Sequence, residues 1–340
     1  MLAKRFLKGI GICLVLAVCA MVFGAAACDA AEKKITIKFA HWYADTHPQH
    51  LAIQRFKELV EERSGGSITV EIYSNSQLGS EDVFIDGVSQ GIIEMGSSGT
   101  MIEKFVPKIA IAEAPFLFNG WKDAEGVFRG EIGKFITALL PEKANMYCAA
   151  ITVNGFRQFS SNKSMASIDL FKGQRIRVPN VPHFIQMVEQ LGGVAVPMAL
   201  SELFTALEGK VVDGQENPAP TIYTSSFWEV QKYVLRSNHM FSPNFWIINK
   251  PFYDAMSDAQ KKAFDSSIQE AAAYNWQISK AADDEAFAGL KAKGVEIQEP
   301  DAAYRKALQD SQEPVYKYFF SRKEGAEEVV SMIRKYQASN

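Results

Sequence analysis

Strand patterns alternate with helix patterns along most of this chain, and that alternation constrains its fold more than any other feature. Residues 35–39 (ITIKF) have the composition of a strand, and 48–63 follow with apolar residues at helical spacing. Residues 67–73 then alternate with a period of two, and 81–90 return to a helical pattern. Strands joined by helices indicate an α/β protein with largely parallel sheets.

The rest of the chain continues this pattern and adds one unusually long helix. Further strands are predicted at 92–96, 146–153, 175–178, 194–198 and 245–249. Ser257 and Gln260 form a capping-box pair, and neither proline nor glycine follows until Gly289. At about 1.5 Å per residue the helix would be roughly 50 Å long, more than the width of one domain of this size. We therefore expect it to run along two lobes with a cleft between them.

The N-terminus predicts export. A short basic start (MLAKRFLK) precedes an apolar run at 9–23, and three alanines follow that run. This pattern is typical of a secretory signal peptide, here expected to span 1–31 with cleavage near 27–31, and the run is too short for a membrane anchor. Cys28 also fits a weak lipoprotein box, in which a lipid on its thiol would tether the protein. Both alternatives predict a periplasmic protein.

Composition excludes several function classes. The chain has 340 residues and a formal charge of −3, without basic clusters, which argues against a nucleic-acid partner. After removal of the signal peptide, enough residues remain for two domains with proper cores. At most Cys28 and Cys148 then remain of the four cysteines, so no disulfide framework is implied. Cys148 lies in an apolar, strand-like run and is expected to be a small buried hydrophobic residue.

Motifs for catalysis or metal binding are weak. The stretch GVSQG at 87–91 fits the G-x-S-x-G pattern, but that motif requires a strand before the serine, and here a helix is predicted before it. His41, His47 and His50 lie close together, yet no cysteine or acidic residue joins them at metal-ligand spacing. We expect these histidines to be solvated or to lie at a helix start. The chain is thus predicted to be neither an enzyme nor a carrier of a metal or cofactor.

The local sequence does not decide the role of two polar stretches. Residues 211–220 (VVDGQENPAP) read most simply as a short strand that stops at a turn, because Gly, Asp, Asn and Pro favour turns. Arg157 follows the strand predicted at 146–153, and Arg175 and Arg177 share one face of the strand at 175–178. Spacing alone favours solvated edge residues for these arginines.

Several motifs together, in this order, resemble one protein family. They are HPQH, YSNSQLGSE, NGFRQF, GQRIRVPN, PMALSELFTALEGKVVDGQENP and FWEVQKYV. The chain resembles the extracytoplasmic solute-binding proteins of tripartite ATP-independent periplasmic (TRAP) transporters, the DctP-like family, over nearly its whole mature length. The resemblance implies a two-lobed, Venus-flytrap-like α/β body braced by a long helix that spans both lobes. By this likeness, residues 32–154 and 243–282 form lobe one, and 155–242 and 283–340 form lobe two.

The resemblance also implies a site. The family binds mostly organic acids, and its signature contact is a salt bridge between the ligand carboxylate and one arginine, which matches Arg177 here. Arg157 matches a second arginine, and Asn217 matches an amide that faces the ligand. The run at 211–220 would then be a wall of the cleft. A planar guanidinium suits this role because its paired donors match the two oxygens of a carboxylate.

Other positions that match pocket-lining residues make this chain individual. They are Trp42, Glu81, Ser98, Leu200 and Phe241. Trp42 stands where relatives often have a smaller or polar residue, and Leu200 replaces what is often phenylalanine. These changes favour a monocarboxylate with ring or apolar character or a sugar acid, with a C4-dicarboxylate as the alternative. Trp42 and Trp246 can equally be packing residues, since most tryptophans are largely buried.

The predicted function is therefore capture of a carboxylate outside the cytoplasm and its delivery to the membrane permease subunits of a TRAP transporter. The protein is expected to act as a monomer. A sensory binding protein that docks on a membrane receptor is an alternative, which the sequence does not separate from a transport role. An enzyme that uses the cleft ranks last, because no nucleophile–base pair or metal cluster is visible.

Overall fold

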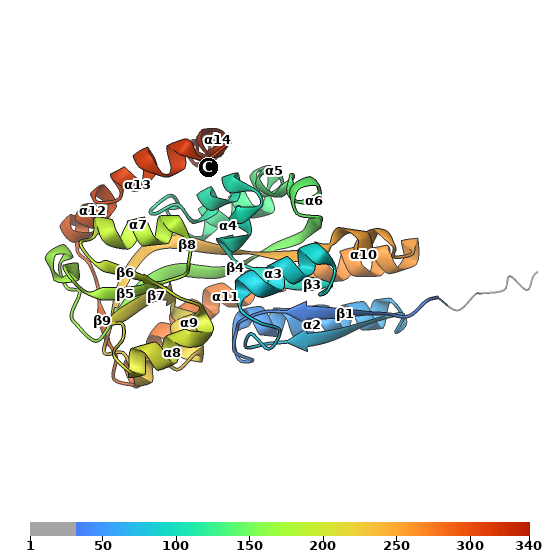
Figure 1. Cartoon of the computed structure of the whole chain (residues 1–340), viewed down its shortest axis with the longest axis horizontal. Helices are drawn as coiled ribbons and strands as arrows, with labels where there is room; N and C mark the ends of the chain where they lie inside the picture. Colours follow the sequence, from blue (N-terminus) through green and yellow to red (C-terminus); the bar gives the residue numbers. More distant parts are fainter. Residues whose placement is uncertain (1–31) are drawn as a thin grey trace, which may run out of the picture. The chain divides into compact units, whose positions relative to one another are not determined.

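The computed structural model describes residues 32–340, and the predicted signal peptide and the predicted lipid anchor at Cys28 lie outside these residues. From Thr36 to Asn340 the chain forms one compact unit. Helices pack around a mixed sheet in which the long strands β4 and β8 run side by side (Figure 1). No helix in the described part of the chain is long and apolar enough to cross a membrane.

The elements follow one another as below. The strands are β1 (Ile35–Ala40), β2 (Ile68–Tyr73), β3 (Met95–Ser98), β4 (Met146–Ser161), β5 (Arg175–Val178), β6 (Val194–Pro197), β7 (Gly214–Pro218), β8 (Tyr233–Asn249) and β9 (Glu296–Gln298). The α-helices are α2 (Pro48–Arg63), α3 (Glu81–Gln90), α4 (Trp121–Arg129), α5 (Glu131–Thr137), α6 (Leu140–Lys143), α7 (Pro182–Gln190), α8 (Leu200–Glu208), α9 (Ala219–Thr224), α10 (Lys250–Asp254), α11 (Asp258–Ala292), α12 (Ala302–Asp310), α13 (Glu313–Tyr318) and α14 (Ala326–Ala338). Short 3₁₀ helices are η1 (Thr100–Lys104), η2 (Pro107–Glu113), η3 (Ile168–Phe171), η4 (Phe227–Glu229) and η5 (Phe320–Arg322).

The sheet is mixed rather than largely parallel. Its order is β2-β1-β3-β8-β4-β7-β5-β6, and β9 pairs with β8. The outer pairs β1–β3, β5–β6, β5–β7 and β8–β9 are parallel, as expected for strands joined by helices. The central pairs β3–β8, β4–β8 and β4–β7 are antiparallel. The prediction missed this because only parts of β4 and β8 carry a strand signal, at 146–153 and 245–249.

Both long strands continue without a break through the middle of the sheet. They pair from Met146 opposite Asn249 to Ser161 opposite Tyr233. The register shifts between Val153 and Gly155 and again between Arg157 and Phe159, and such bulges bend and twist a strand locally. Gly155 has φ 124°, a backbone conformation that only glycine adopts readily.

Several predicted boundaries are confirmed, and one strand is displaced. The helices at 48–63 and 81–90 and the strand at 175–178 have the predicted bounds. β3, expected at 92–96, begins only at Met95. The backbone N–H groups of Ile92 and Ile93 both donate to the carbonyl of Gly87, which closes the C-terminus of α3. These residues are therefore unable to pair in the sheet.

α11 is the long helix that the sequence predicted. It has 35 residues, and its N-terminus carries the full capping box, in which Ser257 and Gln260 bond reciprocally. Along its length it packs against α2 and β4, and also against α9 and β9. α2 belongs to predicted lobe one, and α9 and β9 belong to predicted lobe two, so one helix touches both sets of elements.

Candidate functional site

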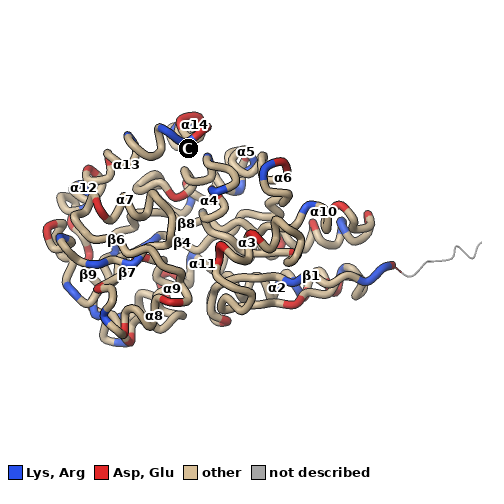
Figure 2. Tube along the Cα trace, in the orientation of Figure 1, with Lys and Arg blue, Asp and Glu red and all other residues tan. Residues whose placement is uncertain are grey.

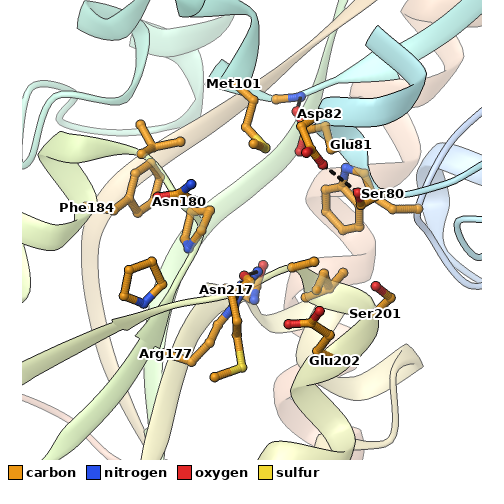
Figure 3. A pocket seen from close by; sticks show the side chains of 18 of the residues that line it. Ser80, Glu81, Asp82, Met101, Arg177, Asn180, Phe184, Ser201, Glu202 and Asn217 are labelled. Carbon is orange, nitrogen blue, oxygen red and sulfur yellow. Dashed lines mark hydrogen bonds between the residues drawn. The ribbon is translucent and has the colours of Figure 1, made fainter. Parts of the chain in front are cut away.

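A cavity of about 460 Å³ brings together six of the eight predicted site residues (Figure 3). These six are Trp42, Glu81, Arg157, Arg177, Leu200 and Asn217. They come from six parts of the chain: the loop after β1, α3, β4, β5, α8 and β7. In Figure 3, Arg177 and Asn217 lie on one wall of the cavity, and Glu81 lies on the wall opposite.

Arg177 is a buried cation without an anionic partner. Its side chain is only 3% exposed, yet it lines the cavity. Its Nε and Nη2 donate to the carbonyl of Met198, at 3.1 and 2.8 Å, and no carboxylate among the described residues forms an ion pair with it. Burial lowers the pKa of Arg177 to about 10, although Glu216 opposes the shift. A buried charge is costly when unpaired, so this guanidinium is a ready partner for an anion.

Arg157, in contrast, is already paired. Its guanidinium forms a two-pronged ion pair with Glu216: Nε donates to one carboxylate oxygen and Nη2 to the other, the second bond at 2.8 Å. Nη2 also donates to Asn217 Oδ1 at 3.2 Å, and Nη1 donates to the hydroxyl of Ser242 at 3.3 Å. Burial alone would lower the pKa of Arg157, but Glu216 outweighs it and raises the pKa. The expectation that Arg157 and Arg177 are solvated on spacing grounds is wrong for both.

The polar run at 211–220 is a buried strand rather than a turn. β7 covers Gly214–Pro218, all five residues are buried, and Val211 and Val212 lie outside it. Each polar side chain finds a partner, because Gln215 donates to Ser160 and Asn217 donates to Gln215, at 2.8 and 2.6 Å. Gly214 is required because a Cβ there would lie 2.3 Å from the carbonyl oxygen of Ser160. Partners elsewhere in the fold thus replace the water that such residues normally seek.

Glu81 sits at the first turn of α3 on the opposite wall. Its Oε1 accepts hydrogen bonds from Ser98 Oγ at 2.9 Å and from the backbone N–H of Gly99 at 2.7 Å. Burial raises the pKa of Glu81 to about 7, even though both of these bonds favour the ionised form. Ser98 does not line the cavity; it positions Glu81.

The two tryptophans in question have different places. Trp42 lines the cavity and stacks on Tyr43, with ring centroids 3.7 Å apart. Trp246 is fully buried, donates its indole N–H to Gln49 at 3.0 Å, and packs edge-on against Phe39. In this structure Trp246 is a packing residue, and only Trp42 belongs to the cavity wall.

Phe241 lies away from the cavity, so its expected place among the lining residues is corrected. It is 1% exposed and belongs to a cluster of aromatic rings inside the molecule. Its ring centroid lies 4.9 Å from that of Phe156, 5.6 Å from Trp121 and 5.9 Å from Phe128. The physical reason is the alternation of β8, whose side chains pass from one face of the sheet to the other: the neighbouring Ser242 lines the cavity instead.

Sequence reasoning missed several lining residues. Glu113, at the end of η2, accepts a hydrogen bond from Ser242, and Phe184 of α7 packs under the guanidinium of Arg157 at 5.1 Å. Met101 and Asn180 complete the walls near Phe184 (Figure 3). Amphipathic spacing on α7 marks Phe184 only as a core residue, and no local pattern marks Glu113. Only the tertiary structure brings these residues to the cavity.

The three N-terminal histidines and Ser89 make structural contacts. His47 caps α2 by accepting a hydrogen bond from the N–H of Gln49, and His50 lies in the first turn of that helix, so the expected helix-start position is confirmed for both. His41 lies outside the helix and is buried, so neither expected alternative holds for it. His41 and His50 share a hydrogen bond of 3.1 Å. Within residues 32–340, no group of three or more His, Cys, Asp or Glu side chains could hold a metal ion. Ser89 is in helix α3 and donates to the carbonyl of Ala144.

Comparison with known proteins gives the family. The family model described as bacterial extracellular solute-binding protein, family 7 (DctP) matches residues 39–323. The chain belongs to this family. Family 7 proteins bind solutes outside the cytoplasm, and the motifs that carried the resemblance lie within the matched residues.

Similar solved structures confirm the fold class. A TRAP periplasmic solute binding protein of Haemophilus influenzae with bound L-gulonate is 33% identical, covers 88% of this chain and 99% of its own, and has a TM-score of 0.85. The sugar acid binding protein of Advenella mimigardefordensis, in complex with galactonate, is 30% identical, with coverage of 90% and 99% and a TM-score of 0.86. This chain therefore has the two-lobed α/β periplasmic-binding-protein fold, with α11 as the long helix.

One curated relative binds a different kind of acid. The C4-dicarboxylate-binding periplasmic protein DctP of Rhodobacter capsulatus is 30% identical over 292 residues, which cover 84% of this chain and 87% of that protein. Family 7 relatives of similar identity thus bind either sugar acids or dicarboxylates, and overall similarity does not choose between them.

Proposed function

We propose that this protein captures an organic acid by forming a salt bridge between its carboxylate and Arg177. The observation that carries the proposal is the environment of Arg177, which is buried, lines a cavity of about 460 Å³ and has no anionic partner among the described residues. Asn217 lies beside it on the same wall and can hydrogen-bond the bound acid. Charge-assisted bonds of this kind contribute about 1.5–3 kcal/mol each.

The charges of the cavity favour a monocarboxylate. Arg157 is neutralised by Glu216, so Arg177 is the cation left for the ligand. Two further carboxyl groups, Glu81 and Glu113, line the same cavity, and in their ionised form they would repel a second acid group. Hydroxyl groups, by contrast, could donate to these carboxylates. A sugar acid or another monocarboxylate is thus the proposed ligand, and a C4-dicarboxylate remains the alternative.

We further propose that the lobes meet where the long strands bend. The division predicted at 154/155 and 242/243 falls at the register shift between Val153 and Gly155, opposite Ser242 and Pro243. Closure of the lobes would exclude water from the cavity and strengthen the attraction of Arg177 for the ligand. A carboxylate that binds the closed form more tightly would then favour closure.

The proposal also covers the protein's membrane partner and its location in the cell. The closed, monomeric protein would deliver its ligand to the membrane permease subunits of a TRAP transporter. Its export would depend on the signal peptide at 1–31. After cleavage the protein would be free in the periplasm or, as the alternative, tethered to the membrane by a lipid on Cys28. Both expectations rest on the sequence and on the family.

A thermal-shift screen with L-gulonate, galactonate and succinate tests the ligand class. A ligand present at a hundred times its dissociation constant adds about 2.7 kcal/mol to the free energy of unfolding, so binding raises the midpoint temperature measurably. We expect stabilisation by a sugar acid and little by succinate. Stabilisation by succinate alone would make the dicarboxylate the ligand instead.

Arg177→Lys tests the salt bridge itself. Lysine keeps the charge but loses the paired donors, so calorimetry should give a dissociation constant at least about tenfold higher, or roughly 1.4 kcal/mol. Arg175→Lys is the matched control, because Arg175 lies two residues away on β5, is exposed and pairs with Asp213. We expect the control to bind as the native protein does. Native affinity in Arg177→Lys would refute the proposed function.

A further inference from the structure

We infer that binding of the acid is coupled to uptake of one proton, and that the proton goes to Glu81. The inference rests on the proposed function, because it concerns the same cavity. Its consequence is that the protein binds its ligand more tightly as pH falls through the neutral range. The basis is the arrangement of charged groups around Glu81.

Only one of the two carboxyl oxygens of Glu81 accepts hydrogen bonds from the protein. Oε1 accepts both hydrogen bonds, from Ser98 Oγ and from the N–H of Gly99, whereas Oε2 has no hydrogen-bond partner in the described part of the chain. The side chain lines the cavity opposite Arg177 and Asn217 (Figure 3). A proton on Oε2 would leave both existing bonds intact and would create a donor that can reach a bound ligand.

The cavity holds more negative than positive charge even before an acid enters. Its cations are Arg157 and Arg177, and Arg157 is already paired with Glu216. Glu81 and Glu113 line the same space, so the cavity holds two carboxyl groups besides the one unpaired cation, Arg177. Asp82 and Glu202, which are exposed and lie at the cavity wall, add to the negative charge. Another carboxylate on Arg177 would therefore increase the repulsion that Glu81 feels.

Groups on the elements packed against α3 do not supply a compensating cation. Helix α3 packs against β3, β8 and η1. On η1, Lys104 pairs with Asp86 at 2.5 Å, and Glu103 pairs with Lys323 at 3.0 Å. β3 (MGSS) has no ionisable side chain. The charged groups of β8 are engaged elsewhere: His239 faces Glu216, and Arg236 pairs with Asp284 and Glu299.

Arg157 and Tyr43 are the remaining titratable groups that act on Glu81. Arg157 lowers the pKa of Glu81, but its guanidinium is held in the ion pair with Glu216. Tyr43 carries no charge to offset. Its hydroxyl donates to Asn244 at 2.6 Å, and burial raises its pKa well above the usual value, so it stays neutral. Glu81 is thus the group whose protonation state can change in this pH range. Burial already places the pKa of Glu81 at about 7, so the free protein contains both forms near neutral pH, and a bound anion would favour the protonated form.

Calorimetry in buffers of different ionisation enthalpy measures the proton directly. At pH 8, with whichever of L-gulonate and galactonate binds, we expect uptake of more than about half a proton per ligand, because a group with pKa near 7 is then mostly ionised before binding. The dissociation constant should rise by up to about tenfold per pH unit between pH 7 and 8.5. Glu81→Gln should abolish both effects.

Asp86→Asn is the matched control. Asp86 is a carboxylate on the same helix, but it lies outside the cavity and pairs with Lys104, so its loss should leave proton uptake as in the native protein. Ser98→Ala provides a second test, because it removes a hydrogen bond that favours the ionised form of Glu81 and should shift the pH of maximal uptake upward. Persistence of uptake in Glu81→Gln would overturn the inference and leave the role of Arg177 standing.

A measurement without ligand separates this inference from the proposed function. In protein labelled with ¹³C at the glutamate carboxyl carbon, one resonance should titrate with a midpoint near pH 7 and should be missing in Glu81→Gln. A midpoint below about pH 5 for that resonance would refute the inference whether or not any acid binds. Failure of all the acids to bind would instead count against the proposed function.

Discussion

At the scale of single residues, the cavity depends on two arginines with opposite environments. Arg157 has a carboxylate of its own in Glu216, which in turn faces His239 at 3.4 Å. Arg177 has only a backbone carbonyl, from Met198. One buried cation is therefore a fixed part of the fold, and the other awaits an anion. The same residue type thus serves structure in one place and, by our proposal, binding in the other.

The first prediction at this scale concerns Glu216. Burial alone would raise the pKa of Glu216, but Arg157 and His239 lower it below its usual value. Glu216→Gln would leave Arg157 buried without its counter-charge, and we expect a loss of about 3–5 kcal/mol in the free energy of unfolding at pH 7, measured by urea denaturation.

The pH dependence and a control complete this test. A carboxylate with a depressed pKa stabilises the fold above its unfolded pKa, and that contribution is lost as pH falls. The difference between native protein and Glu216→Gln should therefore shrink below about pH 4. Glu270→Gln, at an exposed pair with Arg55 and Arg63, should cost far less than Glu216→Gln, because water screens exposed pairs. Equal effects of the two variants would contradict the role given to Glu216.

At the scale of elements, α11 and β7 show why local sequence patterns predict some elements correctly and others not. The capping box of α11 is a contact between residues three apart, so the sequence contains all of it. β7 is a strand of polar residues whose partners, Arg157 and Ser160, belong to another strand. Local chemistry indicated a turn there, and pairing with β4 decided otherwise.

The cap of α11 gives a prediction at this scale. Ser257→Ala removes the side chain that accepts from the N–H of Gln260, and the free energy of unfolding should fall by about 1 kcal/mol. Ser266→Ala, at an exposed position within the same helix, is the control and should change stability by less than about 0.5 kcal/mol. Chemical denaturation measures both. A control as costly as Ser257→Ala would show that the cap itself contributes little.

At the scale of the whole molecule, charged side chains of both signs are distributed over the chain, whereas the histidines are buried. Basic and acidic residues are interspersed over the described chain (Figure 2). All five histidines are buried, and burial lowers the pKa of each: His41, His47, His50, His183 and His239. For His41, His47 and His183 the pKa falls to about 3.

These histidines predict loss of stability in mild acid. The unfolded chain takes up protons on histidine below about pH 6.5, whereas the folded protein keeps these side chains neutral down to much lower pH. Stability is thus fully present above pH 6.5 and falls as the pH drops toward 4. The midpoint temperature should decrease steadily over that range. His183→Asn should make the decrease smaller, and an unchanged slope in that variant would argue against its contribution.

Sequence reasoning succeeded where a structural signal is local. The bounds of α2, α3 and β5 and the cap of α11 follow from spacing and from neighbouring residues. The order of motifs gave the family, and the family gave the places of Arg157, Arg177 and Asn217 in one cavity. The predicted position of Phe241 and the predicted, largely parallel sheet were wrong, because the face of a long strand and its partners depend on distant segments.

By itself the sequence determined the α/β class, the long brace and the residue types able to hold an acid, since each depends on periodicity or on matched motifs. Only the tertiary structure decided which arginine is free. Glu216 and Arg157 are 59 residues apart and meet because β7 pairs with β4, whereas no carboxylate in the described chain forms an ion pair with Arg177. Strand pairing between distant segments decides which charged side chains meet, and it leaves unpaired the one cation that we propose binds the ligand.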